Sequence, residues 1–371
     1  MHRRHFLKHT GLLAAGLLLG CRGNTDTNRP NQTTASWHMP EEGEHHTRTW
    51  MAFGASEPVW GTHLLPEVQH NLATIANTIA RYEPVSMLVR EHELELVRTL
   101  VDSKVNLIVS PLDDLWMRDT GPTFVLNTNN AKSAIDFNFN GWGEKQTFTH
   151  DAQVATFVAN TAAASVINTH LVLEGGCFEV DGKGTAIITE SCVLNDNRNP
   201  SVSKAQFEEQ FMPLLGLQKI IWLPGIRDQD ITDGHTDFYA RFAKPGVVLA
   251  GYDPDPNSYD HEVTLQHLEI LESASDAAGS SLTIHTLEAP STIRDTYNTD
   301  DFAAGYIGYY VCNGAVILQE FGDATTDQAA KKILQDVFPE RVIEQIAIDG
   351  IAAGGGSIHC ATQQEPASKT T

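Results

Sequence analysis

The feature that most constrains the fold is a set of polar, glycine-flanked motifs that recur along the chain. The motifs are WMRDTGP around Asp119, LEGG with Glu174, DGHTD with His235, and GGGSIHC ending at Cys360. Their key residues are separated by 55, 61 and 125 residues, and the last interval is close to twice the first two. A unit of about 60 residues, repeated five times, would bring every motif to one central axis.

Helix-period segments alternate with strand-like segments between these motifs, and several of the strands end at a motif. Apolar residues at three- and four-residue spacing between 64 and 79 predict a helix directly before the strand PVSMLVR. Further helices are predicted near 91–101, 151–163, 203–215, 262–278 and 326–338, followed by the strands VNLIVS, THLVLEGG, KIIWLPG, SLTIHTL and RVIEQIAI. Asp-Gly and Asn-Gly turns predict hairpins in CFEVDGKGTAIIT and YIGYYVCNGAVILQEF. The sequence therefore predicts an α/β fold with added antiparallel hairpins, not a simple Rossmann arrangement.

The N-terminal segment has the pattern of an export signal followed by a tether. A basic start, an apolar stretch from Leu12 to Leu19 and a lipobox-like LLGC predict a signal peptide over residues 1–21, with Cys21 lipidated after cleavage. Arg3 and Arg4 resemble the twin-arginine export signature. Residues 22–36 lack apolar periodicity and predict a flexible tether. We therefore expect a lipoprotein of the bacterial cell envelope that is exported by the twin-arginine route, with a single catalytic domain over residues 37–371.

The net charge of −22 limits the partners that the chain can bind. Nucleic acids and anionic membrane surfaces would be repelled, so the only membrane association that we expect is through the lipid anchor. A small cationic substrate would be attracted to such a protein. Nothing in the sequence indicates the oligomeric state.

Cys360 is the strongest candidate for a nucleophile among the cysteines. Three glycines begin the motif that ends at Cys360, and they indicate that the backbone approaches neighbouring groups closely. Cys192 and Cys312 lie in apolar segments that we interpret as strands, where a buried free cysteine is the ordinary state. The cysteines fit no CxxC zinc pattern and no second histidine lies at ligand spacing to His235, so no metal site is predicted. Pairing among cysteines 177, 192 and 312 stays open.

The motifs DGHTD and WMRDTGP supply groups for acid–base chemistry and for binding a cation. Asp237 lies two residues after His235, so both side chains would face the same side of a strand. A histidine accompanied by a carboxylate suits general acid–base catalysis next to a nucleophile. Asp119 adds a second carboxylate, and carboxylates bind planar guanidinium groups through paired hydrogen bonds. This set fits a guanidine site better than a cysteine protease, which would need an oxyanion hole and a pocket for a neutral amide.

Taken together, the motifs closely resemble those of the agmatine deiminase and bacterial (Porphyromonas-type) peptidylarginine deiminase family. The matching motifs are WMRDTGP, NFNGWG, LEGG, LNDNRNP, TDGHTD and GGGSIHCATQQ, and the resemblance extends from about residue 39 to residue 366. It implies a five-bladed α/β propeller, which is the pentein fold. It also implies hydrolysis of a guanidinium group to a ureido group and ammonia, with neither a metal nor an organic cofactor.

The resemblance also implies roles for individual residues. Cys360 matches the nucleophile that forms a covalent amidino-thioether intermediate, and His235 matches the acid/base that protonates the departing ammonia and then activates water. Asp119 and Asp237 match the carboxylates that clamp the guanidinium group. Glu174 matches the glutamate that supports the histidine and the substrate nitrogens. Further candidate substrate-binding residues are Trp116, Trp142, Asp233 and, for a role beside Glu174, Glu190.

Departures from the family pattern concern the choice of substrate. Agmatine deiminases usually carry Asn where this chain has Ser357 and Ile where it has Ala361, and they commonly carry Asn at the position of Gly308. Agmatine, which would give N-carbamoylputrescine, is favoured because no cluster of arginines follows NGWG to bind a carboxylate. Peptidyl-arginine at the cell surface is the alternative substrate. A lipoprotein that binds guanidines without turnover is less favoured, because the full catalytic set is present.

Overall fold

The computed structural model describes residues 36–299 and 301–368. The predicted signal peptide, Cys21 and residues 22–35 of the predicted tether lie outside the described residues, so those assignments stay predictions. Residues from Ser36 onward group into one unit by their contacts. Among the described residues, no helix combines the length and the apolar character needed to cross a membrane.

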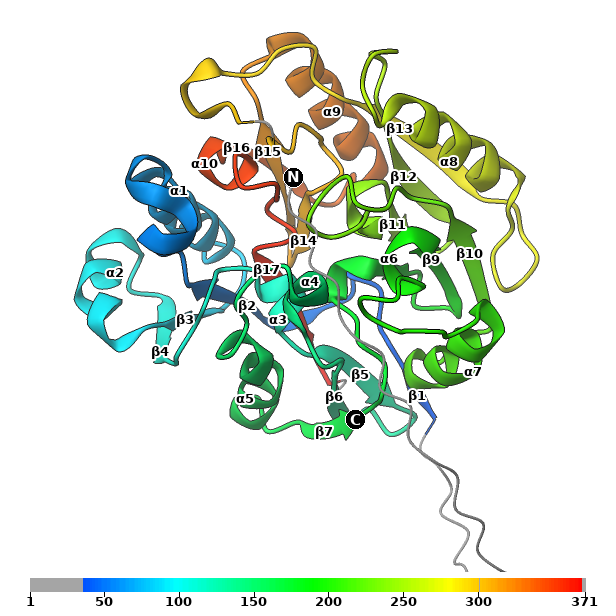
Figure 1. The fold of residues 1–371 in the computed structure, drawn as a ribbon, viewed down its shortest axis with the longest axis horizontal. Coiled ribbons are helices and arrows are strands. Elements are labelled where there is room, and N and C mark those ends of the chain that lie inside the picture. Colours follow the sequence, from blue (N-terminus) through cyan, green and yellow to red (C-terminus); the bar gives the residue numbers. More distant parts are fainter. Residues whose placement is uncertain (1–35, 300, 369–371) are drawn as a thin grey trace, which may run out of the picture. The chain divides into compact units, whose positions relative to one another are not determined.

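Five separate sheets form the framework of this unit (Figure 1). The first contains β17 (Thr362–Pro366), β2 (His46–Phe53), β3 (Val85–Val89) and β4 (Val105–Val109), and the second contains β1 (Trp37–His38), β5 (Thr123–Asn127), β6 (Lys132–Asp136) and β7 (Ser165–Asn168). The others are β8 (Phe178–Val180), β9 (Thr185–Thr189) and β10 (Lys219–Leu223); β11 (Ala240–Lys244), β12 (Val247–Tyr252) and β13 (Thr283–Glu288); and β14 (Tyr310–Cys312), β15 (Ala315–Glu320) and β16 (Val342–Ala347).

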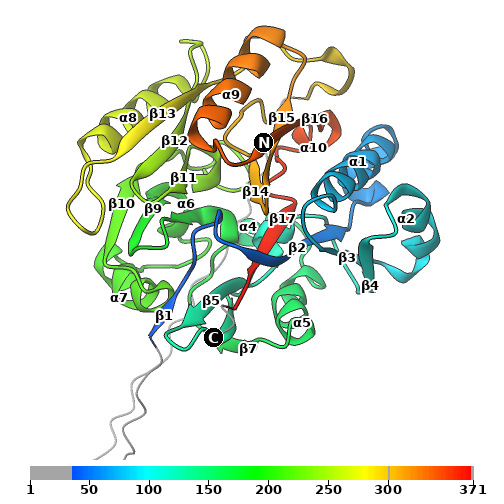
Figure 2. The same cartoon turned by 180° about the vertical axis from the view of Figure 1, so that it is seen from behind.

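Every sheet contains the same local pattern of strand directions. An antiparallel pair is followed by a strand that runs parallel to the second member of the pair. A parallel neighbour requires a crossover connection, and helical segments supply it. In the first sheet the pair is formed by the C-terminal strand β17 and the N-terminal strand β2, which lie side by side in Figure 2. The repeated pattern accounts for the recurrence of the sequence motifs.

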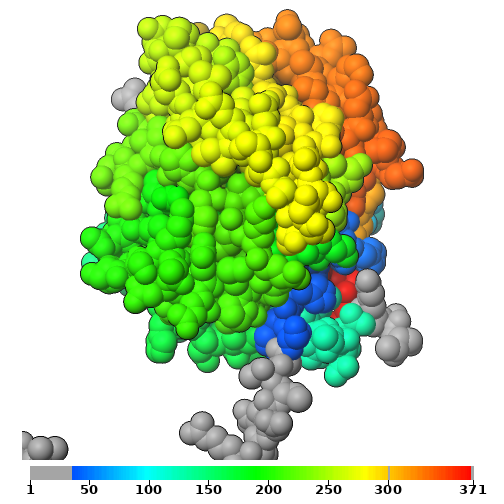
Figure 3. Space-filling view, turned by 90° about the vertical axis from the view of Figure 1, so that its right-hand side faces the viewer, coloured from blue at the N-terminus to red at the C-terminus, as the bar shows by residue number. Residues whose placement is uncertain are grey.

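Helices lie around the outside of these sheets (Figures 1 and 2). The longer ones are α1 (Glu57–Ile79), α2 (Leu94–Leu100), α5 (Val154–Thr161), α7 (Lys204–Leu215), α8 (His261–Ser273) and α9 (Ala324–Val337). Short turns are α3 (Met117–Thr120), α4 (Gly141–Glu144), α6 (Glu190–Val193), α10 (Asp349–Ala352) and the 3₁₀ segments η1 (Glu91–Glu93), η2 (Asp151–Gln153), η3 (Gly175–Cys177), η4 (Thr236–Phe238) and η5 (Asp295–Tyr297). Figure 3 shows one outer face, where yellow segments around residues 270–299 meet the orange segment of α9.

The helices and hairpins predicted from the sequence are present, with shifted ends. Helix α8 stops at Ser273 rather than near residue 278, and α1 is interrupted at Gly61, whose φ is +65°. Both predicted hairpins form, as the antiparallel pairs β8–β9 and β14–β15. In the second hairpin, the predicted Asn-Gly turn places Gly314 at a φ of +81°, a conformation that glycine adopts without strain.

Two predicted strands are wrong. The segment THLVLEGG forms no strand, because side-chain amides satisfy its backbone groups instead of a neighbouring strand. The Asn138 side chain donates to the carbonyl oxygens of residues 169 and 171, and the Asn199 side chain bonds both backbone groups of Val172. Cys192 lies in the short helix α6 rather than in a strand, whereas Cys312 does lie in strand β14.

Candidate functional site

Short helical turns position the residues that the sequence analysis singled out. Asp119 lies in α3, directly before β5, and Glu174 begins the η3 turn before β8. Asp237 lies in the η4 turn before β11, His235 directly precedes that turn as its N-cap, and Cys360 lies in the turn before β17. Each motif therefore follows the last strand of one sheet, β4, β7, β10 or β16, as the sequence analysis expected, and precedes the next antiparallel pair, which begins with β5, β8, β11 or β17. Near the centre of the view in Figure 1, α3 with Asp119 lies beside β17, which follows Cys360.

His235 connects the three predicted carboxylates. Its Nδ1 atom lies 3.8 Å from Asp119 Oδ1 and 3.9 Å from Asp237 Oδ1, and its Nε2 atom lies 3.1 Å from Glu174 Oε2. The prediction that His235 and Asp237 share one face of a strand is wrong, since His235 is the N-cap residue of the 3₁₀ turn η4 and Asp237 lies within that turn. The tight turn nevertheless brings the two side chains together. One imidazole nitrogen thus faces the two aspartates and the other faces the glutamate.

The second glycine of LEGG makes this approach sterically feasible. A Cβ atom on Gly176 would lie 2.5 Å from Nδ1 of His235 and 3.1 Å from both carboxylate oxygens of Asp237. Its backbone N–H donates to Oδ1 of Asp119 at 3.3 Å. A larger residue would push the histidine away from the aspartates, so glycine is required here for packing.

Asp237 carries a buried carboxylate oxygen that has no hydrogen-bond partner. Its Oδ2 atom lies 2.6 Å from Nδ1 of His359, but its Oδ1 atom is buried without any donor. Oδ2 of Asp119 accepts a hydrogen bond from Nε1 of Trp142 at 3.0 Å. Leaving a buried acceptor unpaired costs free energy, and the N–H groups of a guanidinium cation would remove that cost. The two aspartates therefore form an anionic site with unused capacity for hydrogen bonds.

The charges of this cluster depend strongly on burial. Burial raises the pKa of Asp119 to about 6, against the opposing charge of His235. Burial would also raise the pKa of Glu174, but Arg198 and His235 outweigh it and lower that pKa to about 2. For His235, burial on its own lowers the pKa, but the charge of Asp119 and the hydrogen bond to Glu174 raise it well above its usual range. His235 is therefore an imidazolium at neutral pH and can donate a proton to a leaving group.

Cys360 is a neutral thiol in the free protein. Burial, together with the charges of Asp237 and Asp119, raises the pKa of its thiol to about 12. The hydroxyl of Ser357 lies 3.2 Å from the sulfur atom. A bound cation would offset the two negative charges and lower the thiol pKa. The cationic substrate itself would therefore help to form the thiolate.

Alkylation of Cys360 by iodoacetamide tests this protonation state. Because the thiol pKa is raised to about 12, the thiolate fraction of Cys360 keeps increasing as the pH is raised towards that value. We expect the labelling rate of the Cys360 peptide, followed by mass spectrometry, to rise about tenfold per pH unit between about pH 7 and pH 10. A rate that levels off near the ordinary cysteine value of about 8.5 would contradict the raised pKa.

The glycine run before Cys360 packs directly against two tryptophan rings. A Cβ atom on Gly354 would lie 2.2 Å from the ring of Trp60, and one on Gly356 would lie 2.1 Å from the ring of Trp116. Both indole N–H groups donate to Asp114, at 2.8 and 3.0 Å, which fixes the rings in place. The expected close approach of the backbone is therefore confirmed, and its partners are these two rings.

Substitution of Gly356 by alanine should displace the turn that carries Cys360. The new methyl group would overlap the Trp116 ring, which Asp114 holds in place, so the backbone must move. We expect kcat/KM for the substrate to fall by at least about tenfold, since small displacements of a nucleophile have large kinetic effects. Gly305→Ala is the matched control, because a Cβ atom there meets nothing within 4 Å. Equal activities of the two variants would contradict the packing argument.

The predicted substrate-binding residues have different positions. Trp142 donates a hydrogen bond to Asp119, and the ring of Trp116 packs against Gly356. Asp233 contacts the site only through Arg198: its Oδ2 atom is 2.7 Å from Nη1 of Arg198, and Arg198 in turn contacts Glu174. Glu190 is not brought to the cluster: its side chain is 42% exposed and pairs with that of Lys204.

Two residues of the site were missed by the sequence analysis. The Nε atom of Arg198 donates to both oxygens of Glu174 at 2.9 Å, and so holds the carboxylate that contacts His235. His359 lies between Asp237 and Glu42, with nitrogen–oxygen distances of 2.6 and 2.8 Å. Each lies inside a motif, Arg198 in LNDNRNP and His359 directly before Cys360, and that position was the available signal.

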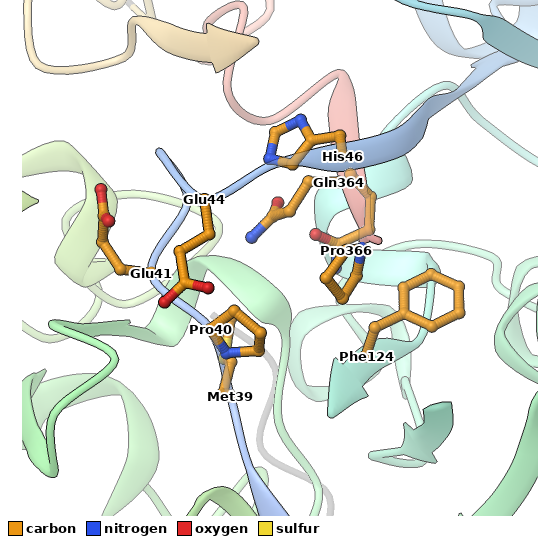
Figure 4. Close-up of a pocket in the computed structure, with 9 residues that line it drawn as sticks. Met39, Pro40, Glu41, Glu44, His46, Phe124, Gln364 and Pro366 are labelled. Atoms are coloured by element: carbon orange, nitrogen blue, oxygen red, sulfur yellow. The ribbon is translucent and has the colours of Figure 1, made fainter. Parts of the chain in front are cut away.

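A small pocket lies apart from the cluster of His235, Asp119, Glu174 and Asp237. It lies between residues 39–46 and the end of β17 (Figure 4). It is lined by Met39, Pro40, Glu41, Glu44, His46, Phe124, Gln363, Gln364 and Pro366. None of the described residues in the His235 cluster lines it. The pocket therefore does not belong to the candidate site.

Comparison with known proteins identifies relatives over nearly the whole described part. The sequence model of the Porphyromonas-type peptidyl-arginine deiminase family matches residues 38–366. The chain is 39% identical to a Streptomyces coelicolor protein named "Putative agmatine deiminase", over 89% of this chain and 99% of that protein. It is 34% identical to the agmatine deiminase of Stutzerimonas stutzeri, over 92% of this chain and 98% of that protein.

A solved structure shares the fold. The agmatine deiminase of Enterococcus faecalis, described as catalysing its reaction, superposes with a TM-score of 0.84 at 30% sequence identity. The match covers 89% of this chain and 96% of that one. The five-sheet arrangement is therefore similar to that of an enzyme that acts on a guanidine.

Proposed function

Because the chain belongs to the Porphyromonas-type peptidyl-arginine deiminase family, we propose that it is a hydrolase that deiminates agmatine, with Cys360 as the nucleophile. The products are N-carbamoylputrescine and ammonia, and no cofactor is required. The observation that carries this function is the buried pair of aspartates around His235, with one unpaired oxygen on Asp237. That arrangement suits the N–H groups of a planar cation.

The first half of the proposed reaction forms a bond between Cys360 and the substrate. Asp119 and Asp237 hold the guanidinium group, and its charge favours loss of the Cys360 proton to solvent, since His235 is already protonated. The thiolate attacks the guanidinium carbon, so that a C–S bond forms. The C–N bond to one terminal nitrogen then breaks, and the imidazolium of His235 gives its proton to the departing ammonia. The enzyme is left with an amidino-thioether on Cys360 and a neutral imidazole.

The second half of the proposed reaction returns the enzyme to its starting state. Neutral His235 accepts a proton from a water molecule, whose oxygen attacks the same carbon. The C–S bond then breaks, the new hydroxyl group on the carbon becomes the carbonyl of a ureido group, and the proton of that hydroxyl returns Cys360 to the neutral thiol. One water is consumed for each ammonia released. Glu174, held by Arg198, keeps the imidazole oriented through both halves.

Two of the three residues that depart from the agmatine deiminase pattern, Gly308 and Ser357, contact each other. A Cβ atom on Gly308 would lie 2.2 Å from the Cβ atom of Ser357, whose hydroxyl lies 3.2 Å from the sulfur of Cys360. The absence of a side chain on Gly308 therefore leaves the room that Ser357 occupies. The two departures form one matched contact beside the nucleophile and leave the aspartates and His235 in place. This supports retained deiminase chemistry.

Peptidyl-arginine is the second candidate substrate, because the matching family is named for it. Agmatine is favoured by the names of the relatives at 34% and 39% identity. Cys360 is only 9% exposed, which suits a slender free molecule better than a residue within a protein chain. The net charge of −22 would also attract agmatine, which carries two positive charges, one on its guanidinium group and one on its amine.

A substrate panel tests the proposed function. Ammonia and ureido product are measured for residues 37–371 with agmatine, free arginine and a peptide that carries an internal arginine. We expect turnover of agmatine and at least about a hundredfold lower kcat/KM for the peptide. Turnover of the peptide alone would replace agmatine by peptidyl-arginine as the substrate. Binding of agmatine without ammonia release would favour a guanidine-binding protein.

Two further proposals concern architecture and location. The five sheets would be the blades of an α/β propeller whose central axis passes through the His235 cluster, as their shared strand pattern supports. The protein would be exported by the twin-arginine route and anchored through lipid on Cys21, as its N-terminal sequence supports. Replacement of both Arg3 and Arg4 by lysine should abolish export, as measured by fractionation of cells; unchanged export would refute that route.

A further inference from the structure

Four potential metal ligands gather on the side of His235 that faces away from the two aspartates. They are Oε2 of Glu174, the sulfur atoms of Cys177 and Cys192, and Nε2 of His235, and all four side chains are buried. The two sulfur atoms are 3.2 Å apart. Oε2 of Glu174 lies 3.0 and 3.8 Å from these sulfurs and 3.1 Å from the histidine nitrogen. The four atoms all lie within 4.8 Å of one another.

These separations are close to the edges of a tetrahedral coordination shell. Zinc bonds of about 2.3 Å to sulfur and about 2.0 to 2.2 Å to nitrogen or oxygen set the ligand atoms about 3.3 to 3.8 Å apart. The donor set of two thiolates, one imidazole and one carboxylate is typical of ligands that zinc accepts. We propose that Glu174, Cys177, Cys192 and His235 form a binding site for a thiophilic divalent cation, with Zn²⁺ as the expected ion.

The groups around the cluster fit a bound cation. Glu174 would use Oε2 for the metal, while Nε of Arg198 continues to donate to Oε1 at 2.9 Å. The other nitrogen of His235 faces the carboxylates of Asp119 and Asp237. Metal-bound carboxylates and histidines are usually oriented by such outer contacts.

Charge in the buried cluster is also balanced. Two thiolates and one carboxylate carry three negative charges, and a divalent cation with Arg198 carries three positive charges. Loading releases one proton from each cysteine thiol and the Nε2 proton of His235 to solvent. Because His235 also borders the position proposed for the guanidinium group, the cation would enter by the route of the substrate.

Occupation of this site would inhibit the enzyme, an expectation that rests on the proposed function. A metal on Nε2 prevents His235 from cycling between imidazolium and imidazole, so it could not protonate the departing ammonia. It also takes Glu174 from its contact with the histidine. We therefore expect Zn²⁺ to act as a reversible inhibitor that a chelator removes.

Cobalt binding tests the site without reference to turnover. Reduced, metal-free protein is titrated with Co²⁺, whose tetrahedral thiolate complexes give intense visible bands and a sulfur-to-metal charge-transfer band. We expect the visible bands and the charge-transfer band in the wild type, in Cys360→Ser and in Cys312→Ser. We expect an affinity for Co²⁺ that is at least tenfold weaker in Cys177→Ser and Cys192→Ser. Absence of tetrahedral bands in fully reduced wild type would overturn the proposal. Bands lost in Cys360→Ser but kept in Cys177→Ser would also overturn it, because the nucleophile would then be the ligand.

Zinc inhibition of agmatine turnover gives the second measurement. Each protein is compared with its own zinc-free rate, and Cys177→Ser should need at least tenfold more Zn²⁺ for half inhibition than the wild type. Serine keeps a donor next to Glu174 and removes the thiolate. Equal zinc sensitivity of the two proteins would contradict inhibition through this site. If the cobalt spectrum forms and agmatine is not turned over, the metal site stands and the proposed function fails.

Discussion

Replacement of Cys360 by serine should lower kcat for agmatine by roughly four orders of magnitude or more while the protein remains folded. A guanidinium carbon is a weak electrophile, and a serine hydroxyl is a much poorer nucleophile than a thiolate at neutral pH. The aspartates that hold the cation would stay in place, because neither contacts the sulfur through a hydrogen bond in the described structure. Agmatine should therefore still bind to the variant without being consumed.

The measurement is ammonia release, together with calorimetric binding of agmatine and a thermal melt. Cys312→Ser is the matched control, since Cys312 is also a buried free thiol but lies in strand β14. The control should keep wild-type kcat within about threefold, although its removal from the core can lower the melting temperature. A Cys360→Ser rate within tenfold of wild type would contradict a covalent mechanism on this residue.

Asp119→Asn should lower kcat/KM for agmatine by roughly a thousandfold. The substitution removes one of the two charges proposed to hold the guanidinium group in a buried site, where charge pairs are strong. It also turns an acceptor of two hydrogen bonds, from Trp142 and from the backbone of Gly176, into a group with two N–H donors of its own. Removal of the Asp119 charge would also lower the pKa of His235, since that charge helps to raise it.

Glu190→Gln is the control for this charge removal. Both substitutions replace a carboxylate by an amide, but Glu190 lies at the surface beside Lys204. We expect its kcat/KM to stay within about twofold of wild type, as is usual for exposed positions. A large loss in Glu190→Gln together with a small one in Asp119→Asn would reverse the assignment of the site.

The sequence alone revealed the recurrence of the motifs. Polar residues flanked by glycines and placed between apolar segments contribute little to a core, so they indicate a functional site. The recurrence correctly predicted the α/β class, both hairpins and the meeting of Asp119, Glu174, His235 and Asp237. The glycine run also predicted close backbone approach, although it could not identify Trp60 and Trp116 as its partners.

Other parts depend on side-chain contacts between distant segments, which local patterns do not contain. THLVLEGG has the composition of a strand, yet the amides of Asn138 and Asn199 bond its backbone instead. Cys177 and Cys192 are 15 residues apart in the chain, and only the fold shows that their sulfur atoms are neighbours. Glu190 was predicted to lie beside Glu174, but α6 places its side chain at the surface, where it pairs with Lys204.

The most direct test of the account is mass spectrometry of the enzyme quenched with acid during turnover of isotopically labelled agmatine. The account predicts that the peptide containing Cys360 carries the mass of agmatine less ammonia, and that this adduct disappears when the substrate is exhausted. Glu174→Gln, which weakens the contact that orients His235, should slow both the formation and the hydrolysis of this adduct. Ammonia release accompanied by an adduct on Cys177 or Cys192, or undiminished in Cys360→Ser, would contradict the central claim.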